Sequence, residues 1–184
     1  FFVKIDTNGS NPKVLEQLEQ AVKVQIEQDK LKKLLGMVQY AMAQQDIRYY
    51  LNGVLLVIDG HFLKLIATDG HRLAYIVIKL DQEYPKREII LPRKTVNELI
   101  KLLAETEEKI TLELAENQVR MTFSNIVLIS KVIDGKFPDY ERVIPNYTNQ
   151  LTLNRIEILQ ALQRAAILSN EKFRGVRFVL TEKN

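Results

Sequence analysis

The segment Thr68-Asp69-Gly70-His71-Arg72-Leu73 concentrates side chains of this sequence that could do chemistry. It places a carboxylate, an imidazole and a guanidinium close together, between apolar runs at 62–67 and 73–78. Asp-Gly is a tight-turn pair, because glycine accepts a positive φ at no steric cost. We therefore expect a β-hairpin turn that holds these groups beside an aliphatic wall.

His71 has two interpretations. In the first, it is the base of an enzyme that also uses Asp69 and Arg72. The second, structural interpretation is favoured, because no second base or nucleophile is placed beside His71 by spacing and the turn explains Asp69. The signatures G-x-G-x-x-G, G-x-x-x-x-G-K-[ST], H-E-x-x-H and G-x-S-x-G are also missing. We expect no catalytic residue, no metal and no other cofactor.

The composition indicates a soluble globular protein. Hydrophobic residues make up 46% of the chain and charged residues 27%, with only seven Gly and five Pro, which argues against disorder. There is no Cys, and no apolar run reaches the roughly 18 residues that a membrane helix needs. The net charge of +3 permits nucleic acid as a partner without requiring it. We expect a cytoplasmic protein with no membrane partner.

Hydrophobic periodicity predicts an α+β order of strand, helix, strands, helix, strands. Helices are expected to begin near Asp29, after Pro92 and after Asn154, with Asp29 and Asn154 as N-caps. Segment 13–20 is either a linker or a short helix. Strands are expected at 1–6, 22–27, 49–58, 62–67, 73–78, 88–91, 110–114, 118–123, 126–133 and 150–153, with a loop at 81–86 and a further short strand ended by Pro145.

A strand-helix opening occurs twice in the sequence. A shift of 127 positions pairs Val24 with Leu151 and Leu31 with Ile158. The second copy runs for only about 34 residues, so most of it is absent. We infer a piece of a longer protein built from tandem α+β domains.

Four segments carry a specific resemblance: Gln45-Asp46-Ile47-Arg48-Tyr49-Tyr50-Leu51-Asn52-Gly53, Ala67-Thr68-Asp69-Gly70-His71-Arg72-Leu73, Asp134-Gly135-Lys136-Phe137-Pro138-Asp139-Tyr140 and Leu168-Ser169-Asn170-Glu171-Lys172-Phe173-Arg174-Gly175-Val176. In this order they resemble the bacterial DNA polymerase III β subunit, the sliding clamp family. The resemblance implies the DNA clamp fold, with helices lining an inner face and antiparallel sheets outside. It also implies one complete domain with parts of two others. On that mapping, residues 1–20 end domain 1, residues 21–146 are domain 2, and residues 147–184 begin domain 3.

The resemblance implies a non-catalytic subunit that confers processivity on the replicative DNA polymerase. Such a subunit encircles duplex DNA without reading its sequence. It holds polymerase and clamp-loader subunits by short hydrophobic peptide motifs in an apolar pocket. Full-length subunits pair into a homodimeric ring, which a piece lacking parts of two domains would not close.

The resemblance also assigns residues to sites. The DNA-binding residues are Gln45, Arg48, Tyr49, Tyr50, Lys30, Lys33, Arg93, Lys94 and Arg142, the last of which also lies at the edge of the pocket. The peptide pocket is Leu51, Thr68, Gly70, His71, Arg72, Leu73, Pro138 and Val143. The subunit interface is Phe2, Ile167 and Leu168. Gln44 departs from a His that is often found in the family, and Lys4 departs from an apolar residue.

Other interpretations of these residues stay open. The cations could form ordinary solvated helix faces, the two tyrosines could be strand residues, and Ile167 with Leu168 could be buried at a helix end. Besides the enzyme, the alternative function is a stand-alone module that binds single-stranded nucleic acid. Tight binding of a short oligonucleotide by this chain alone would favour that module.

Overall fold

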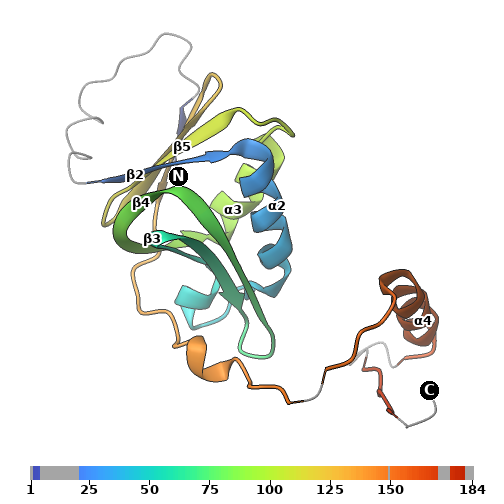
Figure 1. Ribbon diagram of the computed structural model, residues 1–184. Helices are drawn as coiled ribbons and strands as arrows, with labels where there is room; N and C mark the ends of the chain where they lie inside the picture. The colour runs from blue at the N-terminus through green and yellow to red at the C-terminus, as the bar shows by residue number, and fades with distance from the viewer. Residues whose placement is uncertain (1, 5–20, 149, 170–174, 181–184) are drawn as a thin grey trace. The chain divides into compact units, whose positions relative to one another are not determined.

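The computed structural model describes residues 2–4, 21–148, 150–169 and 175–180. The chain divides into two compact units, Phe1–Val143 and Ile144–Asn184. Within the described residues, the first unit contains both sheets and the helices α2 (Gln28–Val38) and α3 (Arg93–Leu102), whereas the second contains α4 (Arg155–Ile167) (Figure 1). The segment 13–20, predicted as linker or helix, lies outside the described residues.

The first unit contains a five-stranded sheet. Its strands are β1 (Phe2–Lys4), β2 (Val22–Glu27), β5 (Lys109–Leu114), β6 (Gln118–Phe123) and β7 (Ile126–Lys131). They run in the order β1, β7, β6, β5, β2, and each neighbouring pair is antiparallel. Buried and exposed residues alternate along β2, as the period-2 pattern predicts. The strands expected from the sequence at these positions are confirmed.

The second sheet is one long hairpin of β3 (Gly53–Thr68) and β4 (Leu73–Pro92). The prediction of separate strands at 49–58, 62–67, 73–78 and 88–91, with a loop at 81–86, is wrong, because each strand of this hairpin is continuous. The pairing register instead shifts on either side of Gly60, whose φ is +56°. An irregularity of this kind absorbs extra residues and lets both strands continue, so the polar residues of the expected loop stay extended.

Helices α2 (Gln28–Val38) and α3 (Arg93–Leu102) pack together on the same side of the sheets (Figure 1). The prediction that Asp29 caps α2 is wrong, because the helix begins at Gln28 and its N-cap is Glu27, which makes no side-chain cap. The first amides of the helix are satisfied by distant carbonyls instead. Gln28 N donates to Glu108 O at 2.9 Å and Asp29 N to Thr106 O at 3.1 Å.

The main core lies between the sheets and the two helices. Leu35 and Val96 are fully buried there with the inward residues of the five-stranded sheet. The buried hydroxyls of Thr95 and Ser130 lie 2.6 Å apart and satisfy each other. A smaller cluster lies on the opposite face of the β3–β4 hairpin and contains Ala43, Leu51, Leu55, Val57, Ile66, Ile90 and Phe137. This second cluster underlies the candidate site.

The second unit contains α4 (Arg155–Ile167). Asn154 caps it as predicted, because its side chain accepts hydrogen bonds from Ile156 N and Glu157 N. The strand predicted at 150–153 is wrong, because these four described residues form no strand. A strand needs a partner for its backbone groups, and none pairs with these residues in the described part of the chain. The short strand expected before Pro145 is replaced by η4 (Glu141–Val143).

In the part of the chain that the structure describes, no helix is both long and apolar enough to cross a bilayer. The same residues bring no three His, Asp or Glu side chains together as a metal site.

Candidate functional site

The turn between β3 and β4 is closed by its own side chains. Asp69 Oδ1 accepts hydrogen bonds from His71 N at 2.9 Å and Arg72 N at 3.0 Å. Thr68 Oγ1 donates to Arg72 O at 2.7 Å and accepts from Gly70 N at 3.1 Å. Gly70 has a φ of +86°, which glycine adopts without strain. The hairpin turn predicted from Asp69-Gly70 is therefore confirmed.

The carboxylate of Asp69 is occupied within this turn. Burial acts to raise its pKa, but the backbone amides of His71 and Arg72 and the charge of Arg72 together hold the pKa below its usual value. Arg72 Nε donates to Asp69 Oδ2 at 3.0 Å. Asp69 thus meets the backbone of His71 and the side chain of Arg72, so the arrangement supports the structural interpretation of these residues.

A cleft of about 380 Å³ opens beside the turn, and we call it the hairpin cleft. It is lined by all the residues that the resemblance assigns to a peptide pocket: Leu51, Thr68, Gly70, His71, Arg72, Leu73, Pro138 and Val143. Four further residues complete the lining: Arg48, Tyr50, Asp139 and Tyr140. The resemblance assigns Arg48 and Tyr50 to the DNA-binding residues only, and it assigns Asp139 and Tyr140 to no site.

The floor of the hairpin cleft is apolar and its rim is polar. Leu51 is 1% exposed and belongs to the smaller core cluster, against which Leu73 packs. The ring of Tyr140 stacks on Tyr75 with centroids 5.8 Å apart, which fixes one wall. Burial raises the pKa of Tyr140 above its ordinary value, so its phenol stays neutral. An apolar cleft with a few polar groups at its edge suits a short peptide with apolar anchors.

The segment between α2 and β3 is fastened to the fold by side-chain amide and guanidinium groups. The Asn52 side chain accepts from Asp46 N at 3.0 Å and donates to Asp46 O at 2.9 Å. Arg93 donates to the carbonyl oxygens of Met42 and Ala43, both at 3.3 Å. Arg93, assigned to DNA by the resemblance, thus also holds the backbone that precedes the tyrosines.

The two tyrosines of this segment lie in η3 (Tyr49–Leu51), so their interpretation as strand residues is wrong. Tyr49 and Tyr50 meet edge to face, with ring centroids 5.8 Å apart. Tyr49 is 58% exposed, whereas Tyr50 is half-buried and lines the hairpin cleft. A β-carbon on Gly135 would lie 3.3 Å from Tyr49 Cε2, so glycine there lets this ring lie close to the backbone. An exposed ring of this kind can stack on a nucleic-acid base.

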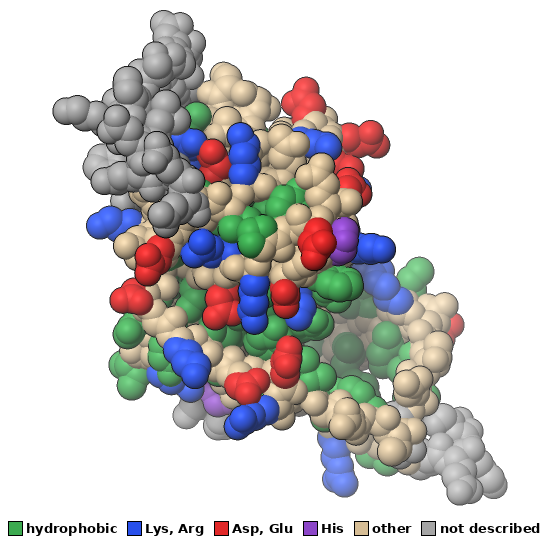
Figure 2. Space-filling view, turned by 60° about the vertical axis from the view of Figure 1, so that its left-hand side comes forward, with side chains coloured by type: hydrophobic (Ala, Val, Ile, Leu, Met, Phe, Trp, Pro, Cys, Tyr) green, Lys and Arg blue, Asp and Glu red, His purple; other side chains and the backbone are tan. Residues whose placement is uncertain are grey.

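The cationic candidates on the helices make exposed local ion pairs. Lys30 Nζ lies 2.8 Å from Glu27 and Lys33 Nζ 3.2 Å from Asp29. Exposed pairs of this kind contribute little to stability, so a phosphate can compete for the lysines. Lys94 is exposed on α3 and Gln45 at the start of the tyrosine segment. On the face seen in Figure 2, basic and acidic side chains are interspersed rather than gathered into one basic patch.

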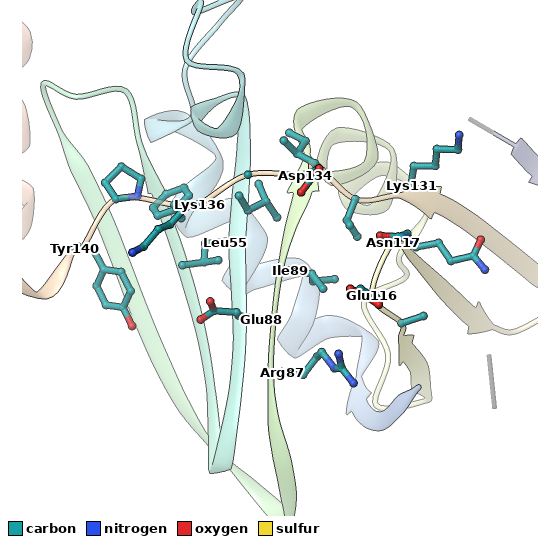
Figure 3. A pocket seen from close by; sticks show the side chains of 18 of the residues that line it. Leu55, Arg87, Glu88, Ile89, Glu116, Asn117, Lys131, Asp134, Lys136 and Tyr140 are labelled. Carbon is teal, nitrogen blue, oxygen red and sulfur yellow. The ribbon is translucent and has the colours of Figure 1, made fainter. Parts of the chain in front are cut away.

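A larger groove of about 1230 Å³ lies beyond Pro138, Asp139 and Tyr140, which line both cavities. Figure 3 shows its side chains, which come from β3 and β4, from the β5–β6 turn and from the end of β7 with the segment that follows it. They carry both signs of charge: Arg87, Lys131 and Lys136 with Glu88, Glu116, Asp134 and Asp139. This mixture favours neither an anion nor a cation, and of the predicted site residues only Pro138 lines the groove.

Asp46 provides a measurable test of the tyrosine segment. Hydrogen bonds from the Arg48 side chain and backbone, with the charges of Arg48 and His71, lower the pKa of Asp46 from 3.8 to about 2. Because the pKa of Asp46 is lower in the folded state than in the unfolded chain, its ionised carboxylate stabilises the fold. This stabilisation is fully present above about pH 4 and is lost as the pH falls through about 2. We expect an NMR titration of the carboxyl carbon to give that value, and Arg48→Ala to return it towards 3.8. An unchanged value in the variant would contradict the ion pair.

A family model described as DNA polymerase III beta subunit, central domain, matches residues 25–139. This stretch is more than half of the chain and includes the turn, both tyrosines and most of the hairpin cleft. The chain belongs to the DNA polymerase III β subunit family. The resemblance inferred from the four sequence segments is therefore confirmed.

Relatives in this family carry the name beta sliding clamp. The proteins of Vibrio cholerae and Pseudomonas aeruginosa are both 45% identical to this chain, over 169 and 160 residues. These alignments cover 91% and 85% of this chain but 46% and 43% of the relatives. The chain thus spans about half the length of the curated relatives it matches.

Solved structures of this family confirm the fold. A crystal structure of the DNA polymerase III subunit beta from Pseudomonas aeruginosa superimposes with a TM-score of 0.79 at 40% identity. The match covers 91% of this chain and 45% of that one. The predicted α+β clamp fold is confirmed, and membership in a sliding clamp family agrees with the prediction that the chain is not an enzyme.

The resemblance assigns three residues to a subunit interface, and the side chains of two of them, Ile167 and Leu168, are described. Ile167 and Leu168 lie at the end of α4 and are 81% and 91% exposed. Their interpretation as residues buried at a helix end is therefore wrong for this chain. Phe2 lies in β1, of which only the backbone is described.

Proposed function

We propose that this chain is the peptide-docking part of a sliding clamp subunit. In this proposal residues 1–20 end the first clamp domain, 21–146 form the second, and 147–184 begin the third. The whole subunit would pair with a second copy, encircle duplex DNA and hold the replicative polymerase and its loader in the cytoplasm. The observation that carries the proposal is the hairpin cleft, which is lined by all eight residues expected of a peptide pocket.

The hairpin cleft supplies what an apolar peptide needs. Leu51 and Leu73 make its floor apolar, so a Leu or Phe anchor would replace water on an apolar surface. Burying each such side chain contributes roughly 1.5–3 kcal/mol. Ordering the peptide and losing its freedom of movement offset part of this gain. Two anchors therefore support weak docking, with a Kd on the order of 100 μM for this chain alone.

A peptide titration tests this part of the proposal. A fluorescent decapeptide with Leu and Phe anchors is titrated with the chain and followed by anisotropy, beside the same peptide with both anchors changed to Ala. We expect saturable binding of the first peptide and none of the second at the same concentrations. Equal binding of both peptides would exclude docking through apolar anchors.

The helices α2 and α3 support the second part of the proposal, contact with duplex DNA. They lie side by side and carry Lys30, Lys33 and Lys94, which can attract phosphates without reading bases. Such contacts favour sliding because no single position on the duplex is preferred. The geometry does not favour the enzyme, since the Asp69 carboxylate is bound by the turn and by Arg72.

Charge reversal on α2 tests the DNA surface. We expect Lys30→Glu with Lys33→Glu to weaken low-salt binding of a 30-base-pair duplex at least fivefold, because two phosphate contacts become repulsive. Lys131→Glu with Lys136→Glu changes the net charge equally at the larger groove and should weaken binding less than twofold. Binding is measured by anisotropy from 25 to 150 mM salt. Equal losses in the two double variants would contradict a DNA surface on α2.

A single-stranded oligonucleotide in the same assay addresses the alternative function. We expect only weak, salt-sensitive binding of either nucleic acid by this chain, because phosphate contacts alone bind weakly at physiological salt. Nanomolar binding of the single strand would favour the stand-alone module over the clamp.

A further inference from the structure

The guanidinium of Arg48 joins the tyrosine segment to the hairpin turn. Its Nε donates to Asp46 Oδ1 at 3.0 Å and one terminal nitrogen, Nη2, donates to Asp46 Oδ2 at 2.8 Å, which makes a bidentate pair. The same Nη2 donates to the carbonyl oxygen of Asp69 at 3.4 Å. Arg48 therefore contacts both segments that border the cleft.

Gly70 leaves room for this contact. A β-carbon on Gly70 would lie 3.1 and 3.2 Å from the two terminal nitrogens of Arg48 and 3.6 Å from Cζ. The guanidinium thus lies against the backbone of the turn itself. Because Gly70 also has a φ of +86°, a side chain there would both strain the turn and push Arg48 away.

Arg48 is itself held from the core side. Asp46, its partner, is fixed by the two hydrogen bonds of the Asn52 side chain. The carbonyl oxygen of Asn52 accepts a hydrogen bond from Arg93 N at 2.9 Å, at the start of α3. This series of contacts from α3 to Gly70 fixes the position of the guanidinium, although the Arg48 side chain is 46% exposed.

We propose that Arg48 is a positioning residue of the hairpin cleft, which holds the Asp69–Leu73 turn through Gly70 and Asp69 with Asp46 as its anchor. This role rests on the proposed peptide docking, and it differs from the phosphate contact that the resemblance assigns to Arg48. The turn supplies Gly70, His71, Arg72 and Leu73 to the cleft, so its placement sets the shape of one wall. Loss of the Arg48 side chain would loosen that wall of the cleft without creating a cavity in the hydrophobic core.

Three variants of the whole chain test the role. Arg48→Ala removes the guanidinium. Asp46→Asn keeps an acceptor for the backbone amide of Arg48 but removes the negative charge. Arg48→Lys keeps the positive charge but cannot make the two parallel hydrogen bonds of a guanidinium. Lys101→Ala is the control, since Lys101 is an exposed cation paired with Glu98 on α3. Each variant is measured by amide NMR shifts of the turn, by peptide affinity, by the urea midpoint and by the salt slope of duplex binding.

We expect Arg48→Ala to move the amide resonances of Gly70, His71 and Leu73 and to weaken peptide binding about fivefold. Asp46→Asn should act in the same direction by at least twofold, and Arg48→Lys should not restore affinity. At pH 7 the urea midpoint should fall only slightly, because the largely exposed Asp46–Arg48 pair contributes little to stability. The salt slope should match the wild type, because the guanidinium touches no phosphate in this role. Lys101→Ala should change none of these measurements.

The outcomes separate this inference from the proposed function. Unmoved turn resonances in Arg48→Ala would overturn the positioning role, whether or not the peptide binds. Moved resonances with unchanged peptide affinity would also overturn it. A salt slope lowered by about one would identify a phosphate contact instead. If the wild type binds no peptide, the proposed function fails, and the turn resonances alone decide whether Arg48 positions the turn.

Discussion

Gly53→Ala is expected to destabilise the first unit by about 3 kcal/mol, because an added methyl group has no room there. A β-carbon at Gly53 would lie 2.2 Å from the carbonyl oxygen of Leu91 and 3.2 Å from Ile133 Cδ1. Leu91 is 2% exposed and paired in the β3–β4 hairpin, so its backbone cannot move aside cheaply. The urea midpoint followed by circular dichroism should fall by 1 M or more, at a typical slope of about 1–3 kcal/mol per molar.

Gly36→Ala is the matched control for this substitution. Gly36 lies inside α2 with nothing within 4 Å of an added β-carbon, so the same methyl group meets open space. We expect a gain of about 0.5–1 kcal/mol, because alanine restricts the unfolded chain and favours the helix. A Gly53→Ala chain that unfolds at the wild-type urea concentration would show that β3 and β4 are not paired here as described.

Val143→Asp is expected to weaken peptide binding at least tenfold, the largest functional effect among the changes considered. Val143 lines the hairpin cleft from η4 and is 64% exposed, so the substitution should leave the fold intact. A docked apolar anchor would have to desolvate the new carboxylate, which costs more than the lost contact itself. The affinity is measured by anisotropy with the same peptide.

Val77→Asp is the control for the peptide prediction. Val77 is 42% exposed on β4 and lies outside the lining of the cleft. The same change of residue there should alter the affinity less than twofold. If both variants lose affinity equally, the peptide does not dock in the hairpin cleft.

Local signals in the sequence predicted the turn and one cap correctly. Asp69-Gly70 requires only a residue that tolerates a positive φ beside one that bonds its own backbone, and both requirements are visible in the sequence. Asn154 caps α4 for the same local reason. The cap of α2 was predicted wrongly because Glu108 and Thr106, some 80 residues away, supply its acceptors.

Long-range contacts explain what the sequence missed at the candidate site. The sequence marked Arg48 and Arg93 as cations, but their acceptors on Asp69 and Met42 come from segments 21 and 51 residues away. The long hairpin was divided into short strands because Asp59-Gly60 has the composition of a turn, and only the pairing shows that it is a register shift. Asp46 and Asn52 carried a weaker signal, as small polar residues that flank the tyrosines.

The most direct test of the central claim is an amide NMR titration of this chain with the decapeptide that carries Leu and Phe anchors. The account predicts that the shift changes gather at Leu51, Thr68, the Gly70–Leu73 turn and Val143, which all line the hairpin cleft, while α2 and α3 stay unchanged. Shift changes gathered on α2 and α3, or along the larger groove instead of the hairpin cleft, would contradict it.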